Sequence, residues 1–137
     1  MELQQVKSIA DRFITELHRI EDGDAAGVNR IVDMFADDAE LTNPLIRRDG
    51  GSRNGHDQIA EFWREYYTAF SHIHSEFFDV TASDHSVGLF WRSEGTNTAG
   101  QPLEYEGVSL LVLDESGKIT RFQGFFDSRQ IAVPANT

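Results

Sequence analysis

The second half of the chain divides into four long segments with strand character, separated by turns too short to hold another element. The segments span about residues 73–82, 87–97, 103–113 and 118–128. Between them stand the sequences SDH, TAGQP and DESG, which are typical of turns. Because short turns join neighbouring strands that run in opposite directions, this pattern predicts an antiparallel meander.

The first half of the chain has helical periodicity. Apolar residues recur at three- and four-residue spacing from Val6 to Ile20, and again from Val28 to Phe35 after the break EDGD. Asp24 in that break can cap the second helix. A third helix is predicted after the loop 47–55, with a mostly aromatic stripe made of Ile59, Phe62, Trp63, Tyr66, Tyr67 and Phe70.

A short strand is predicted between the second and third helices. Ala39, Leu41 and Asn43 alternate with polar residues until Pro44, which removes a backbone donor and ends the strand. Helices followed by a meander predict an α+β fold in one domain, residues 1–137. We expect three helices packed on a curved, mainly antiparallel sheet that encloses a pocket, where small-molecule sites commonly lie.

Charge and composition exclude several classes of partner. The chain has 23 acidic and 12 basic residues, a formal net charge of −11, which repels phosphate backbones and anionic lipids. It has no cysteine, which excludes disulfides and thiol catalysis. Its N-terminal residues lack signal-peptide character, and its longest apolar run is too short for a bilayer. We therefore expect a cytoplasmic protein that binds neither nucleic acid nor membranes.

Several stretches resemble one known superfamily. They are MFADDAEL, the Asn-Pro strand end, NGHDQIAEFW and FWRSEGTNTAGQPLEYEGVSLLVLDESGKITRFQGFFD. Together these stretches resemble the NTF2-like α+β cones, and in particular their SnoaL-like group, over about residues 6–130. The superfamily includes ketosteroid isomerases, limonene-type epoxide hydrolases, polyketide cyclases and members with only binding or assembly roles. The resemblance also implies a homodimer through the outer sheet face, where Val108, Leu110, Val112 and Phe125 would supply apolar contacts.

The isomerase pattern is not met. Those enzymes have an Asp that acts as the general base, a Tyr and a protonated Asp. At the corresponding positions this chain has Asn43, Phe13 and Ser109, in that order. An amide cannot abstract a proton and a phenyl ring cannot donate a hydrogen bond. The chain is therefore not expected to be that isomerase.

The epoxide hydrolase pattern is met in part. Asn43 matches an Asn of that pattern, and Arg92-Ser93-Glu94 resembles its Arg-x-Asp pair. Leu41 and Gly124 stand where the pattern has a Tyr and a second Asp. The mechanism needs one acid to protonate the epoxide while another group activates water, and the second carboxylate is missing.

Asn43, Arg92 and Glu94 are the first candidates for chemistry. Asn43 could orient a carbonyl, a water or an oxyanion, or it could simply bond nearby backbone at a strand end. Arg92 and Glu94 share one strand face. If that face lines the pocket, Glu94 is a candidate base kept ionised by Arg92, and if it faces solvent the two form a surface ion pair.

His72 and His74 also share a strand face. A neutral histidine is a natural base at neutral pH, and exposed histidines on an edge strand are the alternative. Because the set of potential ligands near them is incomplete, we expect no metal and no cofactor. Asp127 is expected to be structural, bonding a helix or loop, and is only an outside candidate for the site.

The expected pocket wall is largely aromatic. Trp63 and Tyr66 have polar tips that need a partner when buried, which a ligand could supply, and Gly124 would let a ligand approach the sheet. Plain core packing is the alternative for each wall residue. The wall candidates are Phe13, Leu17, Phe35, Leu41, Phe62, Trp63, Tyr66, Ser109, Phe122, Gly124 and Phe126.

Two functions from different classes fit these residues. The first is a cofactor-free enzyme that cyclises, isomerises or hydrolyses a small hydrophobic carbonyl or epoxide compound. In it, Asn43 orients the oxygen, Glu94 or the two histidines move the proton, and Arg92 sets the charge. The second is a hydrophobic-ligand-binding or dimerisation module without chemistry, which a pocket lacking a perturbed acid would favour.

Overall fold

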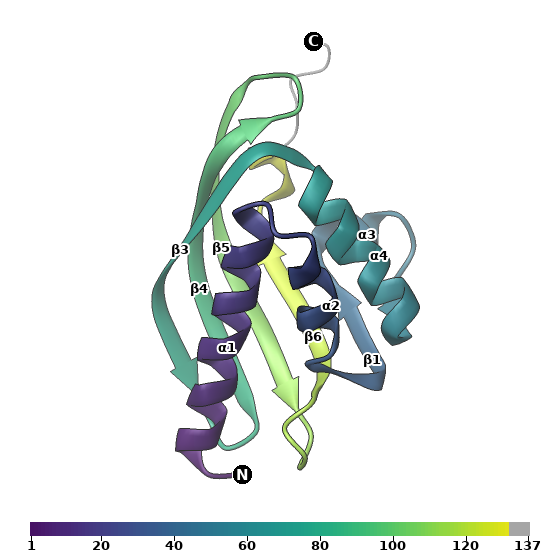
Figure 1. Cartoon of the computed structure of the whole chain (residues 1–137), viewed down its shortest axis with the longest axis vertical. Coiled ribbons are helices and arrows are strands. Elements are labelled where there is room, and N and C mark those ends of the chain that lie inside the picture. Colours follow the sequence, from purple (N-terminus) through teal and green to yellow (C-terminus); the bar gives the residue numbers. More distant parts are fainter. Residues whose placement is uncertain (132–137) are drawn as a thin grey trace.

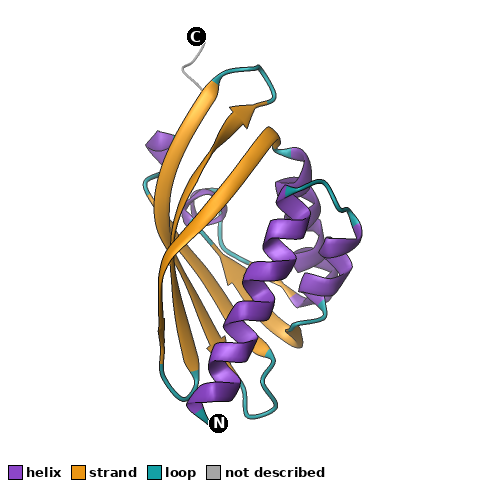
Figure 2. Cartoon of the chain, turned by 60° about the vertical axis from the view of Figure 1, so that its left-hand side comes forward, coloured by secondary structure: helices purple, strands orange, loops and turns teal. Residues whose placement is uncertain are grey.

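A curved sheet with helices on its concave side makes up the computed structural model, which describes residues 1–131 (Figures 1 and 2). The helices are α1 (Leu3–Glu21), α2 (Ala26–Val32), α3 (Pro44–Arg48), α4 (Gly55–Thr68) and the 3-10 helix η1 (Ser128–Gln130). The strands are β1 (Phe35–Thr42), β2 (Arg53–Asn54), β3 (Phe70–Ala82), β4 (Ser86–Asn97), β5 (Pro102–Leu113) and β6 (Ile119–Phe126). This arrangement confirms the predicted α+β cone. None of the helices within residues 1–131 combines the length and apolar character that crossing a membrane requires.

The six strands form one sheet in the order β2-β1-β6-β5-β4-β3. The meander from β3 to β6 is antiparallel, as predicted, and only β1 and β6 pair in parallel. Each meander strand begins and ends within three residues of its predicted bounds. Because β1 inserts beside β6, the chain segment that ends at Asn43 lies next to the middle of the sheet.

Local differences from the prediction occur around Pro44. The predicted loop contains the short helix α3, which Asn43 caps, and the two-residue strand β2. Phe35, predicted in the second helix, instead begins β1. Proline at the first position of a helix loses no hydrogen bond, so Pro44, which cannot continue the strand, starts α3 directly after the cap residue Asn43.

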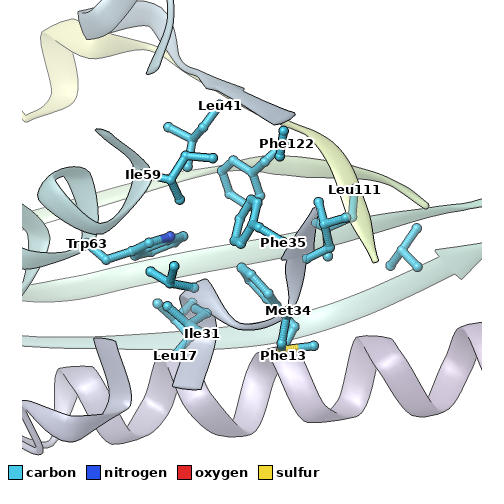
Figure 3. Packing of buried hydrophobic residues seen from close by; sticks show 14 of the residues in the cluster. Phe13, Leu17, Ile31, Met34, Phe35, Leu41, Ile59, Trp63, Leu111 and Phe122 are labelled. Atoms are coloured by element: carbon cyan, nitrogen blue, oxygen red, sulfur yellow. The ribbon is translucent and has the colours of Figure 1, made fainter. Parts of the chain in front are cut away.

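The core lies between the helices and the concave face of the sheet (Figure 3). Phe13 of α1, Ile59 of α4 and Phe122 of β6 meet there. Phe35 and Leu41, both expected in the pocket wall, are fully buried in this core and do not border the cavity described below. The inner residues of β1 therefore support the site without lining it.

Candidate active site

A cavity of about 300 Å³ opens between α1, α4 and the concave face of the sheet. Its wall contains most of the residues predicted for it: Phe13, Leu17, Phe62, Trp63, Tyr66, Ser109, Phe122, Gly124 and Phe126. The ring of Trp63 meets Phe13, Phe62, Tyr66 and Phe122 in edge-on contacts, with centroids between 4.8 and 6.0 Å apart. Such interlocked aromatic contacts give the cavity a rigid apolar wall.

Asn43 borders the cavity and also caps α3. Its Oδ1 accepts a hydrogen bond from the backbone N–H of Ile46 at 2.9 Å, which assigns the other side-chain atom as Nδ2. Nδ2 has no protein partner among the described residues. The Asn43 oxygen therefore bonds nearby backbone, one of the two alternatives predicted for it, and its N–H₂ group stays available as a donor at the cavity.

Ser109 supplies a second donor close to Asn43. The indole N–H of Trp91 donates to Ser109 Oγ at 3.0 Å, so the Ser109 hydroxyl proton remains free to point elsewhere. Ser109 pairs in register with Gly124, and a Cβ atom on Gly124 would lie 3.4 Å from Asn43 Cβ. Asn43 and Ser109 thus flank Gly124, and we call these two residues the donor pair.

A hydrogen-bond network centred on Glu21 forms another part of the wall. Glu21, the last residue of α1, accepts hydrogen bonds from Tyr66 Oη at 2.6 Å, from Ser75 Oγ at 2.6 Å and from the Ser75 backbone N–H at 2.9 Å. Ser75 Oγ in turn lies 2.5 Å from Ser93 Oγ. Ser75, Ser93 and Tyr66 border the cavity, so the charge of Glu21 reaches it through hydroxyl groups.

Two tyrosines near Glu21 keep their protons at neutral pH. Burial, together with the negative charge of Glu21, raises the pKa of Tyr66 well above its usual value. The same two causes raise the pKa of Tyr105, which pairs in register with Ser93 and also borders the cavity. Neither phenol can serve as a base, but each can donate a hydrogen bond.

Among the residues that the structure describes, the charged ones that border the cavity are Asp49, Arg53 and Glu65, which lie at its mouth. Arg53 Nη2 binds Glu65 Oε1 at 3.0 Å, while Arg53 Nη1 is buried without a hydrogen-bond partner in residues 1–131. Trp63 Nε1 is likewise buried and unpaired in the described part of the chain. Of the two polar tips singled out in the sequence, that of Tyr66 is satisfied by Glu21 and that of Trp63 is not.

Arg92 and Glu94 lie on the outer face of the sheet, away from the cavity. Both are exposed, and Arg92 Nη2 lies 3.6 Å from Glu106 Oε2, with both side chains at least half exposed. The inner face of β4 carries Trp91 and Ser93 instead. Arg92 and Glu94 therefore face solvent, which is the second of the two alternatives predicted for them. Glu94 is too far from the cavity to act as a base in it.

His72 and His74 are also exposed and outside the cavity. The His74 ring stacks on His18 of α1 at the sheet edge, with centroids 5.3 Å apart. Potential ligand atoms of His18, Glu21 and His74 come within 4.8 Å of one another. Because both Glu21 oxygens already accept hydrogen bonds from Ser75 or Tyr66, we assign Glu21 to that network and not to a metal.

Asp127 caps η1 and does not border the cavity. It accepts hydrogen bonds from the Arg129 backbone and guanidinium, and these hydrogen bonds lower the pKa of Asp127 to about 2. This placement fits the structural role expected for Asp127.

Four polar residues in or directly behind the inner wall are not predicted from the sequence. They are Ser75, Ser93 and Tyr105, which border the cavity, and Glu21, which binds Ser75 from behind. Ser75 and Ser93 do carry a sequence signal, because each alternates with apolar residues that point inward, namely Ile73 and Trp91. No local signal marks Glu21, whose partner Ser75 stands 54 residues away.

Comparison with known proteins identifies the family. The SnoaL-like domain family matches residues 10–122, and no curated protein matches the chain. One similar structure is SalBIII, an epoxide hydrolase/cyclase-like enzyme in pyran ring formation in the polyether salinomycin, with 22% identity over 93% of this chain and 94% of that chain, and a TM-score of 0.72.

Two further structures have the same fold. TerC, co-crystallised with polyporic acid, is 21% identical over 93% of this chain and 95% of that chain, with a TM-score of 0.74. An NTF2-like protein of unknown function from Burkholderia pseudomallei K96243 is 19% identical over 96% of this chain and 95% of that chain, with a TM-score of 0.78. On the match over residues 10–122, this chain belongs to the SnoaL-like domain family.

Proposed function

We propose that the cavity binds a small hydrophobic molecule with a carbonyl or epoxide oxygen, and that the donor pair holds this oxygen. The observation that supports this proposal most directly is the position of two free donors. Asn43 Nδ2 and the Ser109 hydroxyl flank Gly124 in an otherwise apolar wall. Donors fixed in an apolar site bind an acceptor oxygen strongly, because water does not compete for them.

The donor pair also suits catalysis. Two fixed donors stabilise negative charge that develops on an oxygen, as in cofactor-free isomerisation, cyclisation or hydrolysis. With Glu94 and both histidines on the outside, proton transfer in such an enzyme would depend on a carboxylate at the mouth. Asp49 is the better candidate, since Glu65 is bound to Arg53 and Asp49 has no ion-pair partner among the described residues.

The alternative is a binding module of the same fold that performs no reaction. Its support is that, within residues 1–131, no histidine borders the cavity and the only carboxylates that do so, Asp49 and Glu65, lie at the mouth and not in the inner wall. Turnover of a carbonyl or epoxide compound by the wild-type chain would exclude the binding module, and Asp49→Asn should then lower this turnover at least tenfold.

The ligand class is tested with two compounds that differ at one group. We expect 2-acetylnaphthalene to bind more tightly than 2-ethylnaphthalene by about tenfold, because only the ketone accepts hydrogen bonds from the donor pair. Isothermal titration calorimetry measures both affinities. Equal affinities, or binding of neither compound, would contradict the proposed function.

We also propose that the chain forms a homodimer through the outer face of the sheet. Phe90, Val108 and Phe125 form one row across β4, β5 and β6, with Phe78 beside Phe90, and Phe78 and Phe125 are 51% and 47% exposed. Exposed apolar rows of this kind mark interfaces. Leu110 and Val112 lie beside the row on the same face.

Phe125→Glu is expected to convert the dimer into monomer, because it replaces an exposed apolar side chain of the row by a charge that the interface would have to bury. Light scattering after size-exclusion chromatography measures the mass. The control is Asp11→Ala at an exposed position of α1, on the opposite side of the sheet, which should leave the dimer intact. A wild-type chain that runs as a monomer at tens of micromolar would refute the proposal.

A further inference from the structure

Three hydroxyl groups in one wall of the cavity are all oriented by Glu21. Glu21 has no proton to give in its ionised form, so Tyr66 Oη and Ser75 Oγ must be the donors in their 2.6 Å contacts with it. Ser75 has a single hydroxyl proton, and that proton is committed to Glu21. The 2.5 Å contact between Ser75 and Ser93 must therefore be donated by Ser93.

This orientation leaves Ser93 with acceptor capacity only. Its proton points to Ser75, away from the cavity, while its oxygen lone pairs remain on a residue that borders the cavity and is 2% exposed. The Tyr66 oxygen is in the same state, since its proton points to Glu21. The oxygens of Ser93 and Tyr66, which we call the acceptor wall, thus offer lone pairs, whereas Asn43 and Ser109 offer protons. The Tyr105 phenol beside Ser93 has no hydrogen-bond partner among residues 1–131, so it can either donate or accept there.

The acceptor wall and the donor pair lie at opposite ends of the cavity. Ser109 pairs with Leu89, and Ser93 lies four residues further along β4, which places the two ends about 13 Å apart along the strand. Trp91 lies between them and contributes apolar surface. A single elongated ligand could reach both ends.

We propose that the acceptor wall recognises a hydroxyl group of the ligand, so that the ligand class is a hydrophobic hydroxy-carbonyl compound with its two oxygens at opposite ends. This inference rests on the proposed function, which supplies the carbonyl end. The ligand hydroxyl donates to Ser93 Oγ, and the chain of hydrogen bonds continues through Ser75 to the Glu21 carboxylate. Ser93 contacts the ligand, and Glu21 is a positioning residue that sets the direction of every hydrogen bond in the chain.

Glu21→Gln should reverse the direction of the hydrogen bonds between residue 21, Ser75 and Ser93, because glutamine has the shape of glutamate but carries an N–H₂ group. The Ser75 backbone N–H can only donate, so it fixes the amide oxygen of the new side chain and turns the amide N–H₂ towards Ser75 Oγ and Tyr66 Oη. Ser75 then donates to Ser93, and Ser93 donates into the cavity. An acceptor wall becomes a donor wall.

The test compares 2-acetyl-6-hydroxynaphthalene with 2-acetyl-6-methoxynaphthalene by isothermal titration calorimetry. Both carry the ketone, and only the first has a hydroxyl donor at the far end. Wild-type protein should bind the hydroxy compound about tenfold more tightly. Ser93→Ala should bring the two affinities to within about twofold. Glu21→Gln should strengthen binding of the methoxy compound several-fold relative to wild type, a gain that structural damage cannot produce.

Three results would overturn the inference. Equal affinity of wild-type protein for both compounds, with 2-acetylnaphthalene still bound, would overturn this inference alone. A Glu21→Gln variant that binds both compounds more weakly by the same factor would show that Glu21 has only a structural role. Failure of the wild-type chain to bind 2-acetylnaphthalene as well as these two compounds would overturn the proposed function together with the inference.

Discussion

Gly124→Leu is expected to lower the affinity for 2-acetylnaphthalene at least about 100-fold while the chain stays folded. Gly124 borders the cavity between Asn43 and Ser109, and its backbone is not in the left-handed region, so a side chain is allowed there. A Cβ atom would meet only Asn43 Cβ at 3.4 Å and ring atoms of Phe126 at 3.8 Å or more. The leucine side chain would therefore extend into the cavity and occupy the position proposed for the ligand oxygen.

The matched control is Arg121→Leu, which adds the same side chain to β6 at an exposed position of the strand. It should bind the ketone as wild type does. Calorimetry gives the affinities, and thermal unfolding shows whether each variant is folded. A folded Gly124→Leu variant with wild-type affinity would mean that the ligand binds outside the cavity.

Asn43→Asp is expected to weaken ketone binding by roughly 100-fold with little change in thermal stability. Aspartate caps a helix as well as asparagine does, so the hydrogen bond from the Ile46 N–H is retained. The free N–H₂ group is replaced by a carboxylate oxygen, which removes one donor and repels the carbonyl oxygen of the ligand. Loss of a hydrogen bond combined with repulsion in an apolar site accounts for the size of the effect.

Asn43→Ser provides the neutral comparison. Serine also caps helices, but its hydroxyl oxygen lies one bond closer to the backbone than the amide nitrogen, so the donor moves away from the ligand oxygen while no charge is added, and a smaller loss of about tenfold is expected. Affinity for 2-ethylnaphthalene, which has no oxygen, should change less than twofold in both variants. If both compounds weaken equally, Asn43 shapes the cavity and does not bind the oxygen.

The fold could be predicted because its strongest signals are local. Short turns between long strands require antiparallel neighbours, and the structure has β3 to β6 in that arrangement. The helical stripe of α4 suggested Phe62, Trp63 and Tyr66 as pocket-wall candidates, and all three border the cavity. The parallel pairing of β1 with β6 has no such local signal, since it joins segments far apart in the chain.

The polar side of the site was harder to predict, because β4 is apolar on both faces. Leu89 and Trp91 point inward, while Phe90 points outward and belongs to the proposed dimer row. Because Phe90 is apolar too, this part of β4 lacks the alternation of apolar and polar residues that would indicate the inner face. Because Arg92 and Glu94 are opposite charges on one strand face, the sequence favours them as candidates for chemistry. The structure has both on the outer face, and Ser93 between them borders the cavity. The alternation of Ser93 with Trp91 indicates its face of the strand, but a serine on an inward face can pack in the core as well as line a cavity.

Glu21 could not be placed from sequence for a different reason. It ends an amphipathic helix, where a charged residue is ordinary, and its role depends on contacts with Tyr66 and Ser75 on other elements. Only the packing of both α1 and α4 against β3 brings these groups together. Sequence patterns indicate which face of an element is buried, but not which polar groups meet across the core.

A crystal structure of the chain with 2-acetylnaphthalene is the most direct measurement of the central claim. The predicted result is a ketone oxygen within about 3.2 Å of both Asn43 Nδ2 and Ser109 Oγ, with the rings packed against Trp63 and Phe122. A ketone oxygen that points to the mouth near Arg53, or a ligand bound on the outer face of the sheet, would contradict the account.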